Sequence, residues 1–243
     1  NTESAFITAL IIFLIFSPTS SLFDLTALVL AGAIAMISKY IFTINKKHIF
    51  NPAALAALIL GISQLGTPLW WVGSEVLTPI VLLIGLLVVR KIRKFTLFFS
   101  FFIICVSTII FFGILQGTDI FDLAKQAITS WPILFFGFIM LTEPQTTPQS
   151  KKLQIMYGAL IGFIFSSQFH IGLIYATPEL ALITGNIIFF ILSPKKTLIL
   201  FLNEKIKLSS QIHEFSFANK TKFAFIPGQY LEWTLPHSNP DIR

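Results

Sequence analysis

The sequence predicts an all-α polytopic membrane protein of about eight crossings, followed by a short polar region with the alternation of β-strands. Of the 243 residues, 55% are hydrophobic and only 12% are charged. Apolar runs long enough to span a bilayer, such as residues 22–42 and 95–115, recur along the chain. Lys and Arg gather in short clusters between these runs, a distribution typical of cytoplasmic loops in membrane proteins.

Each apolar run is bounded by polar or turn-forming residues, which define the expected crossings. In chain order, the runs are 5–16, 22–42, 49–62, 69–89, 95–115, 131–141, 153–175 and 178–192. A Ser-Pro-Thr-Ser-Ser turn at 17–21 ends the first run, and Asn51-Pro52 starts the third. The polar loop 116–130 carries Asp119 and Asp122, while residues 197–202 are interpreted as an interfacial extension.

The basic clusters predict how the crossings are oriented. With every cluster on the cytoplasmic side, the eight runs alternate without conflict, which predicts a multi-pass inner-membrane protein with a cytoplasmic C-terminal part. The clusters are Lys46-Lys47, Arg90–Lys94, Lys151-Lys152 and Lys195-Lys196. Asp24, Asp122 and the tryptophans Trp70, Trp71 and Trp131 then fall near the outer face, where tryptophan is favoured.

The chain also contains signs of an internal duplication. Residues 21–25 resemble residues 119–123, and the Asn51-Pro52 break corresponds to Glu143-Pro144. These landmarks predict two parallel repeats of four crossings with broken helices, since an even number of crossings leaves the repeats in one orientation. Chance similarity between apolar segments is the alternative.

After Asn203 the composition becomes polar, which predicts domains at 1–203 and 204–243. Residues 213–217 and 230–235 alternate as strands do, with Asn219-Lys220 as the turn between them. This part is too short to hold a core alone. We expect the chain to be a fragment at both ends.

Several functional classes are not expected. The net charge of +6 comes from the clusters between apolar runs, so no nucleic-acid partner is expected. Cys105 is the single cysteine, which excludes a disulfide within the chain, and the four histidines lack metal-ligand spacing. No nucleophile–base set or phosphate loop indicates hydrolytic chemistry.

The two proline breaks carry the candidate site. Asn51, Pro52, Thr142 and Glu143 lie beside the breaks, where two broken helices could bind a flavin-like group at a helix start or a cation at freed carbonyls. The alternative is that these residues are ordinary helix caps. An ionisable group at membrane depth is costly, which favours a function for Glu143, with Asn51 its expected neighbour.

A second set of polar residues lies within or beside other runs. Glu75, Glu179 and Asn186 are candidates for an ion or proton path, although a carboxylate at a helix start also complements the helix dipole. Asn186 falls in mid-span and should bond across helices. Gln168 and His170 are interpreted as interfacial residues, with cofactor ligation as the alternative.

Residues 42–192 resemble the FMN-carrying membrane component of the Rnf electron-transport complex and its counterpart in the sodium-pumping NADH:quinone reductase. The resemblance rests on these stretches: Ile49-Phe-Asn-Pro-Ala53, Gly73-Ser-Glu75, Phe138-Ile-Met-Leu-Thr-Glu-Pro-Gln-Thr-Thr-Pro148, Tyr157-Gly158 and Glu179-Leu-Ala-Leu182 with Asn186. It implies a membrane domain that transfers electrons and binds FMN or riboflavin.

The tail is similar to the opening strands of the FAD-binding barrel of ferredoxin reductases. Residues 223–232, with Pro227-Gly-Gln-Tyr230, match the strand that carries Pro-Gly-Gln in that family, which makes Tyr230 a candidate cofactor-binding residue. The family's Arg-x-Tyr-Ser/Thr segment, which binds FAD, would follow Arg243. The resemblance therefore implies a truncated barrel, with the FAD and NAD(P)H sites beyond this chain.

One departure from the membrane family concerns the covalent flavin. Its members attach FMN through the threonine of a Ser-Gly-Ala-Thr motif, which this chain lacks. The nearest fragment is Gly66-Thr67-Pro68-Leu69, so Thr67 is the candidate attachment point, with an ordinary turn residue as the alternative. Covalent FMN is therefore doubtful in this chain.

Together these features predict the membrane component of a flavin-dependent NAD(P)H oxidoreductase. Electrons would pass from FAD in the reductase part to a flavin, quinone or redox-protein acceptor at the lipid bilayer. Two alternatives remain: a transporter or channel with parallel repeats, in which Asn51 and Glu143 line the path, or a passive anchor for a reductase.

Overall fold

The computed structural model describes residues 2–19, 21–44, 47–148, 150–167, 170–171, 174–192 and 200–219. The helices are α1 (Thr2–Ile15), α2 (Leu22–Ile41), α3 (Pro52–Ile62), α4 (Thr78–Ile92), α5 (Phe95–Leu115), α6 (Ile120–Thr129), α7 (Ile133–Phe135), the π-helix η1 (Phe136–Met140), α8 (Lys151–Ser166) and α9 (Pro178–Leu192). The strands are β1 (Thr43–Ile44), β2 (Lys47–His48), β3 (His170–Ile171), β4 (Ile174–Tyr175), β5 (Leu200–Lys207) and β6 (His213–Asn219).

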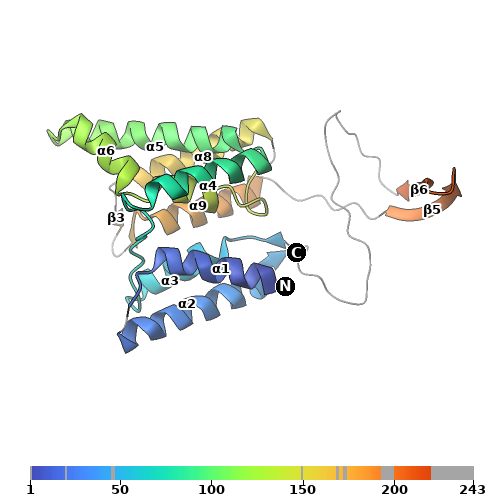
Figure 1. Ribbon diagram of the computed structural model, residues 1–243, viewed down its shortest axis with the longest axis horizontal. Coiled ribbons are helices and arrows are strands. Elements are labelled where there is room, and N and C mark those ends of the chain that lie inside the picture. Colours follow the sequence, from blue (N-terminus) through green and yellow to red (C-terminus); the bar gives the residue numbers. More distant parts are fainter. Residues whose placement is uncertain are drawn as a thin grey trace. The chain divides into compact units, whose positions relative to one another are not determined.

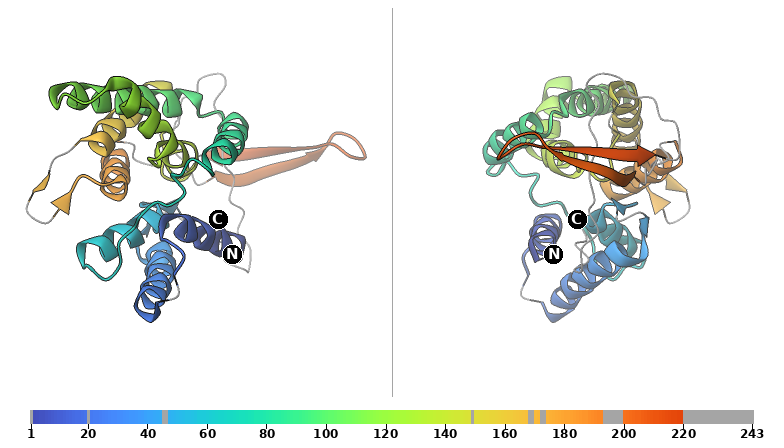
Figure 2. Two further views of the ribbon diagram at one scale, coloured as in Figure 1. Left: turned by 60° about the vertical axis from the view of Figure 1, so that its left-hand side comes forward. Right: turned by 90° about the vertical axis from the view of Figure 1, so that its right-hand side faces the viewer.

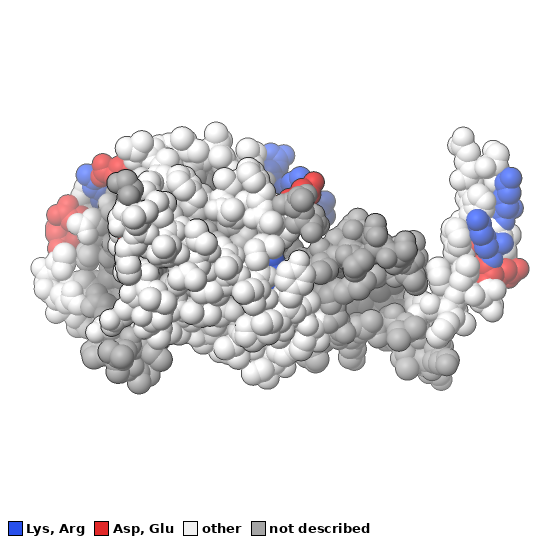
Figure 3. Space-filling view, turned by 90° about the horizontal axis from the view of Figure 1, so that it is seen from below, with Lys and Arg blue, Asp and Glu red and all other residues white. Residues whose placement is uncertain are grey.

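The chain divides into two compact units, Asn1–Ser193 and Pro194–Ile242. The first is the helical unit, in which α1, α2 and α3 form one group and α4, α5, α6 and α8 form another (Figures 1 and 2). Helix α9 contacts both α3 and α8 and so joins the two groups. On the face shown in Figure 3, charged side chains lie mainly at the two ends of this unit, with a broad uncharged surface between them.

The expectation of eight crossings is not supported. Within the described residues, α2 and α5 are the two helices long and apolar enough to cross a membrane. The pair α6 and α7–η1, bent by 55°, would add a third if it counts as one span. The helices formed by the other apolar runs have 16 residues or fewer. Helix α3, with 11 residues, extends roughly 16 Å, about half of a ~30 Å hydrocarbon core.

The two expected repeats are not supported as units of four crossings either. The segments before the two proline breaks also differ in structure. The first break follows the short antiparallel pair β1–β2, whereas the second follows η1, a π-helical turn. The landmark residues Ser21 and Asp119 do occupy equivalent positions, since each is the N-cap of a helix.

Aromatic and small residues hold the helices together. Helix α8 approaches α5 through Gly158, where an added Cβ would lie 2.7 Å from the backbone oxygen of Leu97. Phe101 of α5 and Phe136 of η1 are both fully buried, with ring centroids 5.3 Å apart. The core of the helical unit therefore fixes η1, and with it the start of the second break.

In the second unit, β5 and β6 form an antiparallel hairpin with a bulge between Leu202 and Glu204. The expected strand at 213–217 is confirmed as part of β6. It pairs, however, with β5, whose first residues were interpreted as an interfacial extension. The expected domain boundary at 203/204 falls inside β5, and the compact units instead divide at Ser193/Pro194. The predicted strand at 230–235, the turn residue Lys220 and Tyr230 lie outside the described residues.

Candidate functional site

The two proline breaks meet inside the helical unit. Asn51 caps α3, because its Oδ1 accepts a hydrogen bond from the Ala54 backbone nitrogen at 3.0 Å, and Pro52 follows at the first helical position. The Asn51 Nδ2 donates to Glu143 Oε2 at 2.9 Å, across 92 residues of sequence. The expected juxtaposition of Asn51 and Glu143 is therefore confirmed, and Asn51 is also the N-cap of α3.

A closed hydrogen-bond network extends from this pair. The Asn51 backbone N–H donates to Asn186 Oδ1 at 2.9 Å, and Asn186 Nδ2 donates to the Tyr157 hydroxyl at 2.8 Å. Tyr157 donates to the Thr146 carbonyl at 3.4 Å, and the Thr146 hydroxyl reaches Glu143 Oε2 at 3.5 Å. Asn186 is fully buried, and it bonds across helices as expected for a mid-span amide.

Lys39 supplies a buried positive charge near the network. Its Nζ donates to the Ser4 carbonyl and hydroxyl at 2.9 Å each and to the Thr8 hydroxyl at 2.7 Å. Ser4 and Thr8 are four residues apart on α1, so their two hydroxyl groups lie on the same face of that helix. The ammonium group is thus solvated by α1, and its charge attracts Glu143.

The electrostatics of Glu143 follow from this environment. Glu143 lies in the loop after η1, outside the candidate spans. Burial raises the pKa of its carboxyl from 4.5 to about 7, although the Asn51 amide, the charge of Lys39 and the Thr146 hydroxyl favour the ionised form. A carboxyl group with such a pKa exchanges a proton near neutral pH, which suits it to proton transfer.

The other residues of the second break form hydrogen bonds with the loop itself and with neighbouring helices. The Thr142 hydroxyl donates to the Phe138 carbonyl at 2.5 Å, and this bond connects Thr142 to η1. Thr147 donates to the Glu143 carbonyl at 2.8 Å. The Pro148 carbonyl accepts from Lys94 Nζ at 2.6 Å and from Gln154 Nε2 at 3.2 Å. These bonds fix the loop that presents Glu143.

The remaining predicted site residues lie apart from the Asn51–Glu143 network. Glu179 is buried at the start of α9, where Trp70 Nε1 donates to its Oε1 at 3.0 Å. Glu75 and Thr67 are exposed in the segment between α3 and α4. Gln168 and Tyr230 lie outside the described residues, and the side chain of His170, in β3, is not described.

Sequence reasoning missed Lys39, Tyr157 and Trp70 as site residues. Lys39 was visible as a lysine within an apolar run, together with the polar pair Ser4 and Thr8 at helical spacing. Tyr157 belongs to the motif Tyr157-Gly158, but the sequence did not indicate which residues it would hydrogen-bond to. Trp70 was interpreted as a residue of the membrane interface, although its indole is buried against Glu179.

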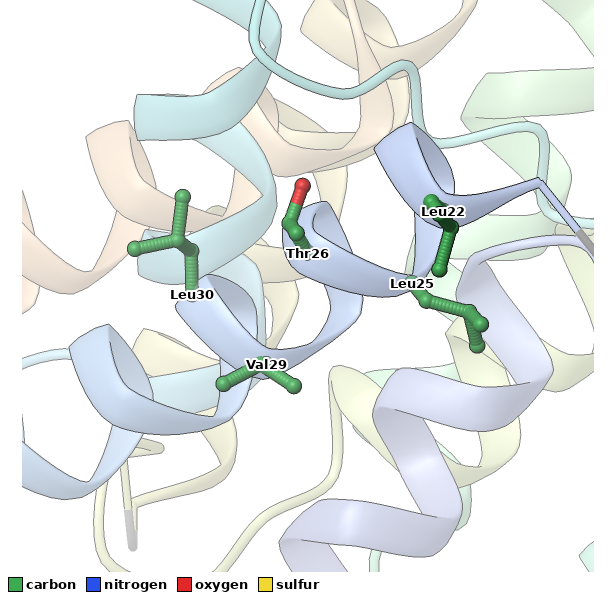
Figure 4. Close-up of a pocket in the computed structure, with 5 residues that line it drawn as sticks. All are labelled: Leu22, Leu25, Thr26, Val29 and Leu30. Carbon is green, nitrogen blue, oxygen red and sulfur yellow. The ribbon is translucent and has the colours of Figure 1, made fainter.

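No metal site emerges from the described part of the chain, in which no group of three or more His, Cys, Asp or Glu residues could hold an ion. A shallow groove of about 390 Å³ lies along α2 and is lined by Leu22, Leu25, Thr26, Val29 and Leu30 (Figure 4). Four of these five side chains are aliphatic, so the groove offers little for recognising a polar ligand.

No protein-family model, curated protein or solved structure matches this chain.

Proposed function

We propose that this chain is the membrane component of a flavin-dependent NAD(P)H oxidoreductase in the inner membrane. In the full-length protein, a cytoplasmic reductase part with FAD would deliver electrons to a flavin, FMN or riboflavin, held at the two proline breaks. The acceptor would be a quinone, a second flavin or a redox protein. The observation that carries the proposal is the contact between Asn51 and Glu143, which joins the two stretches that most resemble the membrane component of the Rnf complex.

The residues of the network suit a planar ring with both donors and acceptors on its edge. Asn51 offers an amide, Glu143 a carboxyl group and Tyr157 a hydroxyl group, and all three come from different segments of the chain. Side chains of these types cannot carry electrons themselves, so a bound flavin would supply that chemistry. The chain would position the ring, and Glu143 would exchange protons near neutral pH.

Retention of flavin by the purified protein tests this proposal. We expect the wild-type protein to copurify with flavin, visible as an oxidised-flavin absorption band that dithionite bleaches. Asn51→Ala removes both the cap and the bond to Glu143, and should lower flavin retention about tenfold. Glu143→Gln should preserve the fold, because volume and hydrogen bonding are nearly conserved, while reductase-driven electron transfer falls.

Glu75→Gln is the matched control, since Glu75 is an exposed carboxylate away from the network. It should leave flavin content and electron transfer unchanged. Wild-type protein that never holds flavin, even after reconstitution with FMN or riboflavin, would refute the proposal. A normal flavin content and a normal rate of electron transfer in Glu143→Gln would mean that Glu143 has only a structural role.

A transporter or channel is the second candidate, and the buried polar network with Lys39 nearby is the observation that favours it. Proteoliposomes separate the two functions. Specific solute or ion flux without any chromophore would favour the transporter, whereas bound flavin without such flux would favour the oxidoreductase. A reductase that works equally well when cut from this chain would indicate a passive anchor.

A further inference from the structure

A second buried carboxylate lies apart from the proposed flavin site. Glu179 is the second residue of α9, and its side chain is only 2% exposed. Its Oε1 accepts the hydrogen bond from Trp70 Nε1, whereas its Oε2 has no hydrogen-bond partner among the residues that the structure describes. Less than 1 Å² of that oxygen is accessible, so no water-sized space adjoins it.

The indole over Glu179 is held by several elements. Trp70 has a φ of 50°, a left-handed conformation that is rare for a bulky residue and persists only where the surroundings impose it. The backbone nitrogens of Leu69 and Trp70 both donate to the Ile15 carbonyl at the end of α1, at 3.1 and 2.7 Å. The ring also packs against Phe135 and Phe136, at centroid distances of 6.4 and 6.0 Å.

Within the described part of the chain, the groups that act on the Glu179 carboxyl are uncharged. They are the Trp70 indole, the Thr177 hydroxyl and the backbone at the start of α9. The neighbouring elements add Ile15 and two phenylalanines, again without charge. The charged residues of α1 and of the 63–77 segment, Glu3 and Glu75, have no described contact with Glu179.

The surroundings of the Glu179 carboxyl favour a proton over a metal ion as its ligand. An ionised carboxylate with an unpartnered, buried oxygen is far more costly than the neutral acid. A metal ion would need several oxygen ligands at 2.0–2.6 Å, roughly, and therefore space beside Oε2, which is sealed. A proton needs no space, because it forms a covalent O–H bond to the oxygen already present.

We propose that Glu179 is a proton-binding site, protonated while Trp70 covers it and able to exchange its proton with water only when the segment Leu69–Val72 moves away from α9. Protonation adds one proton from water to Oε2, and release returns it. The inference does not depend on flavin binding, because none of these residues belongs to the Asn51–Glu143 network.

Infrared spectroscopy of the full chain in lipid bilayers tests the site. The carbonyl stretch of a neutral carboxylic acid should be present near neutral pH and should shift in deuterated water. Glu179→Gln should remove that band, while Glu75→Gln should retain it. Because a protonated Glu143 would give a carbonyl band of the same kind, the same comparison is also made in a Glu143→Gln background.

Trp70→Phe provides a second variant that keeps the carboxyl group. Loss of the indole donor should shift the band and speed its exchange into deuterated water about tenfold, the effect of one hydrogen bond. The control Trp131→Phe should do neither, since Trp131 lies outside the segment Leu69–Val72.

Three results would overturn the proposal. The first is a folded Glu179→Gln variant that retains the whole band, which would mean that Glu179 is ionised. The second is a band that disappears on addition of Na⁺ but not of K⁺, which would indicate a cation site. The third is an unchanged exchange rate in Trp70→Phe, which would show that the Trp70 indole does not limit the exchange of the Glu179 proton with water.

Discussion

Phe98 of α5 and Phe138 of η1 stack face to face, with ring centroids 3.9 Å apart and an interplanar angle of 8°. Gly85 of α4 also leaves room for Phe138, because a Cβ there would lie 2.4 Å from the ring. Phe138 is five residues before Glu143, so this packing anchors the helix that leads to the second break.

Phe138→Ala should therefore destabilise the protein by ~3–5 kcal/mol, the usual cost of truncating a buried phenylalanine. The measurement is denaturant or thermal unfolding in detergent. Phe111→Ala is the control, because Phe111 is 58% exposed and its truncation leaves no cavity. Equal losses for the two variants would show that Phe138 is not part of the core.

Gly158→Ala should separate α5 from α8 at a point where the two helices pack closely. The new Cβ would lie 2.1 Å from Ser100 Oγ, which can rotate, and 2.7 Å from the Leu97 carbonyl, which cannot. We expect a loss of about 1–3 kcal/mol, typical of overpacking. Gly32→Ala on α2 meets nothing within 4 Å and should instead gain ~0.5–1 kcal/mol from helix propensity. A neutral result at Gly158 would mean that the helices pack less closely.

Stability should depend on pH through Glu143. Since folding raises the pKa of this carboxyl from 4.5 to about 7, the folded state binds the proton more tightly. Its contribution to stability is therefore complete below about pH 4.5 and is lost as the pH rises through about 7. Glu143→Gln should flatten that part of the curve of unfolding temperature against pH, while Glu75→Gln should leave it intact. The same slope in wild type and Glu143→Gln would contradict this assignment.

Lys39→Met should move the Glu143 transition upward in pH. The charge of Lys39 favours ionised Glu143, so its removal raises the pKa of that carboxyl further. The shift would be seen in the same unfolding curves. Lys125→Met, at an exposed position on α6, controls for net charge. A transition that stays in place in Lys39→Met would show that the two charges do not interact.

The pairing of Asn51 with Glu143 could be predicted from sequence because both flank a proline break beside lysines. The number of crossings could not, since a run of apolar residues does not reveal where a helix stops. Residues 49–62 are apolar apart from Asn51, yet α3 has only 11 residues. The contact between Trp70 and Glu179 joins residues 109 positions apart and depends on a left-handed tryptophan, for which the sequence carries no signal. Strand β5 was missed because its first residues continue an apolar pattern.

The π-helical turn at Phe136–Met140 sets the angular register of everything that follows it. A π-turn accommodates one residue more than an α-turn, and each residue advances a helix by about 100°. If the same five residues wound as α-helix with none deleted, the segment that follows would rotate by roughly that angle, and the carboxyl of Glu143 would move away from Asn51. The meeting of the two breaks thus depends on the length of one helical turn as much as on the residues that meet.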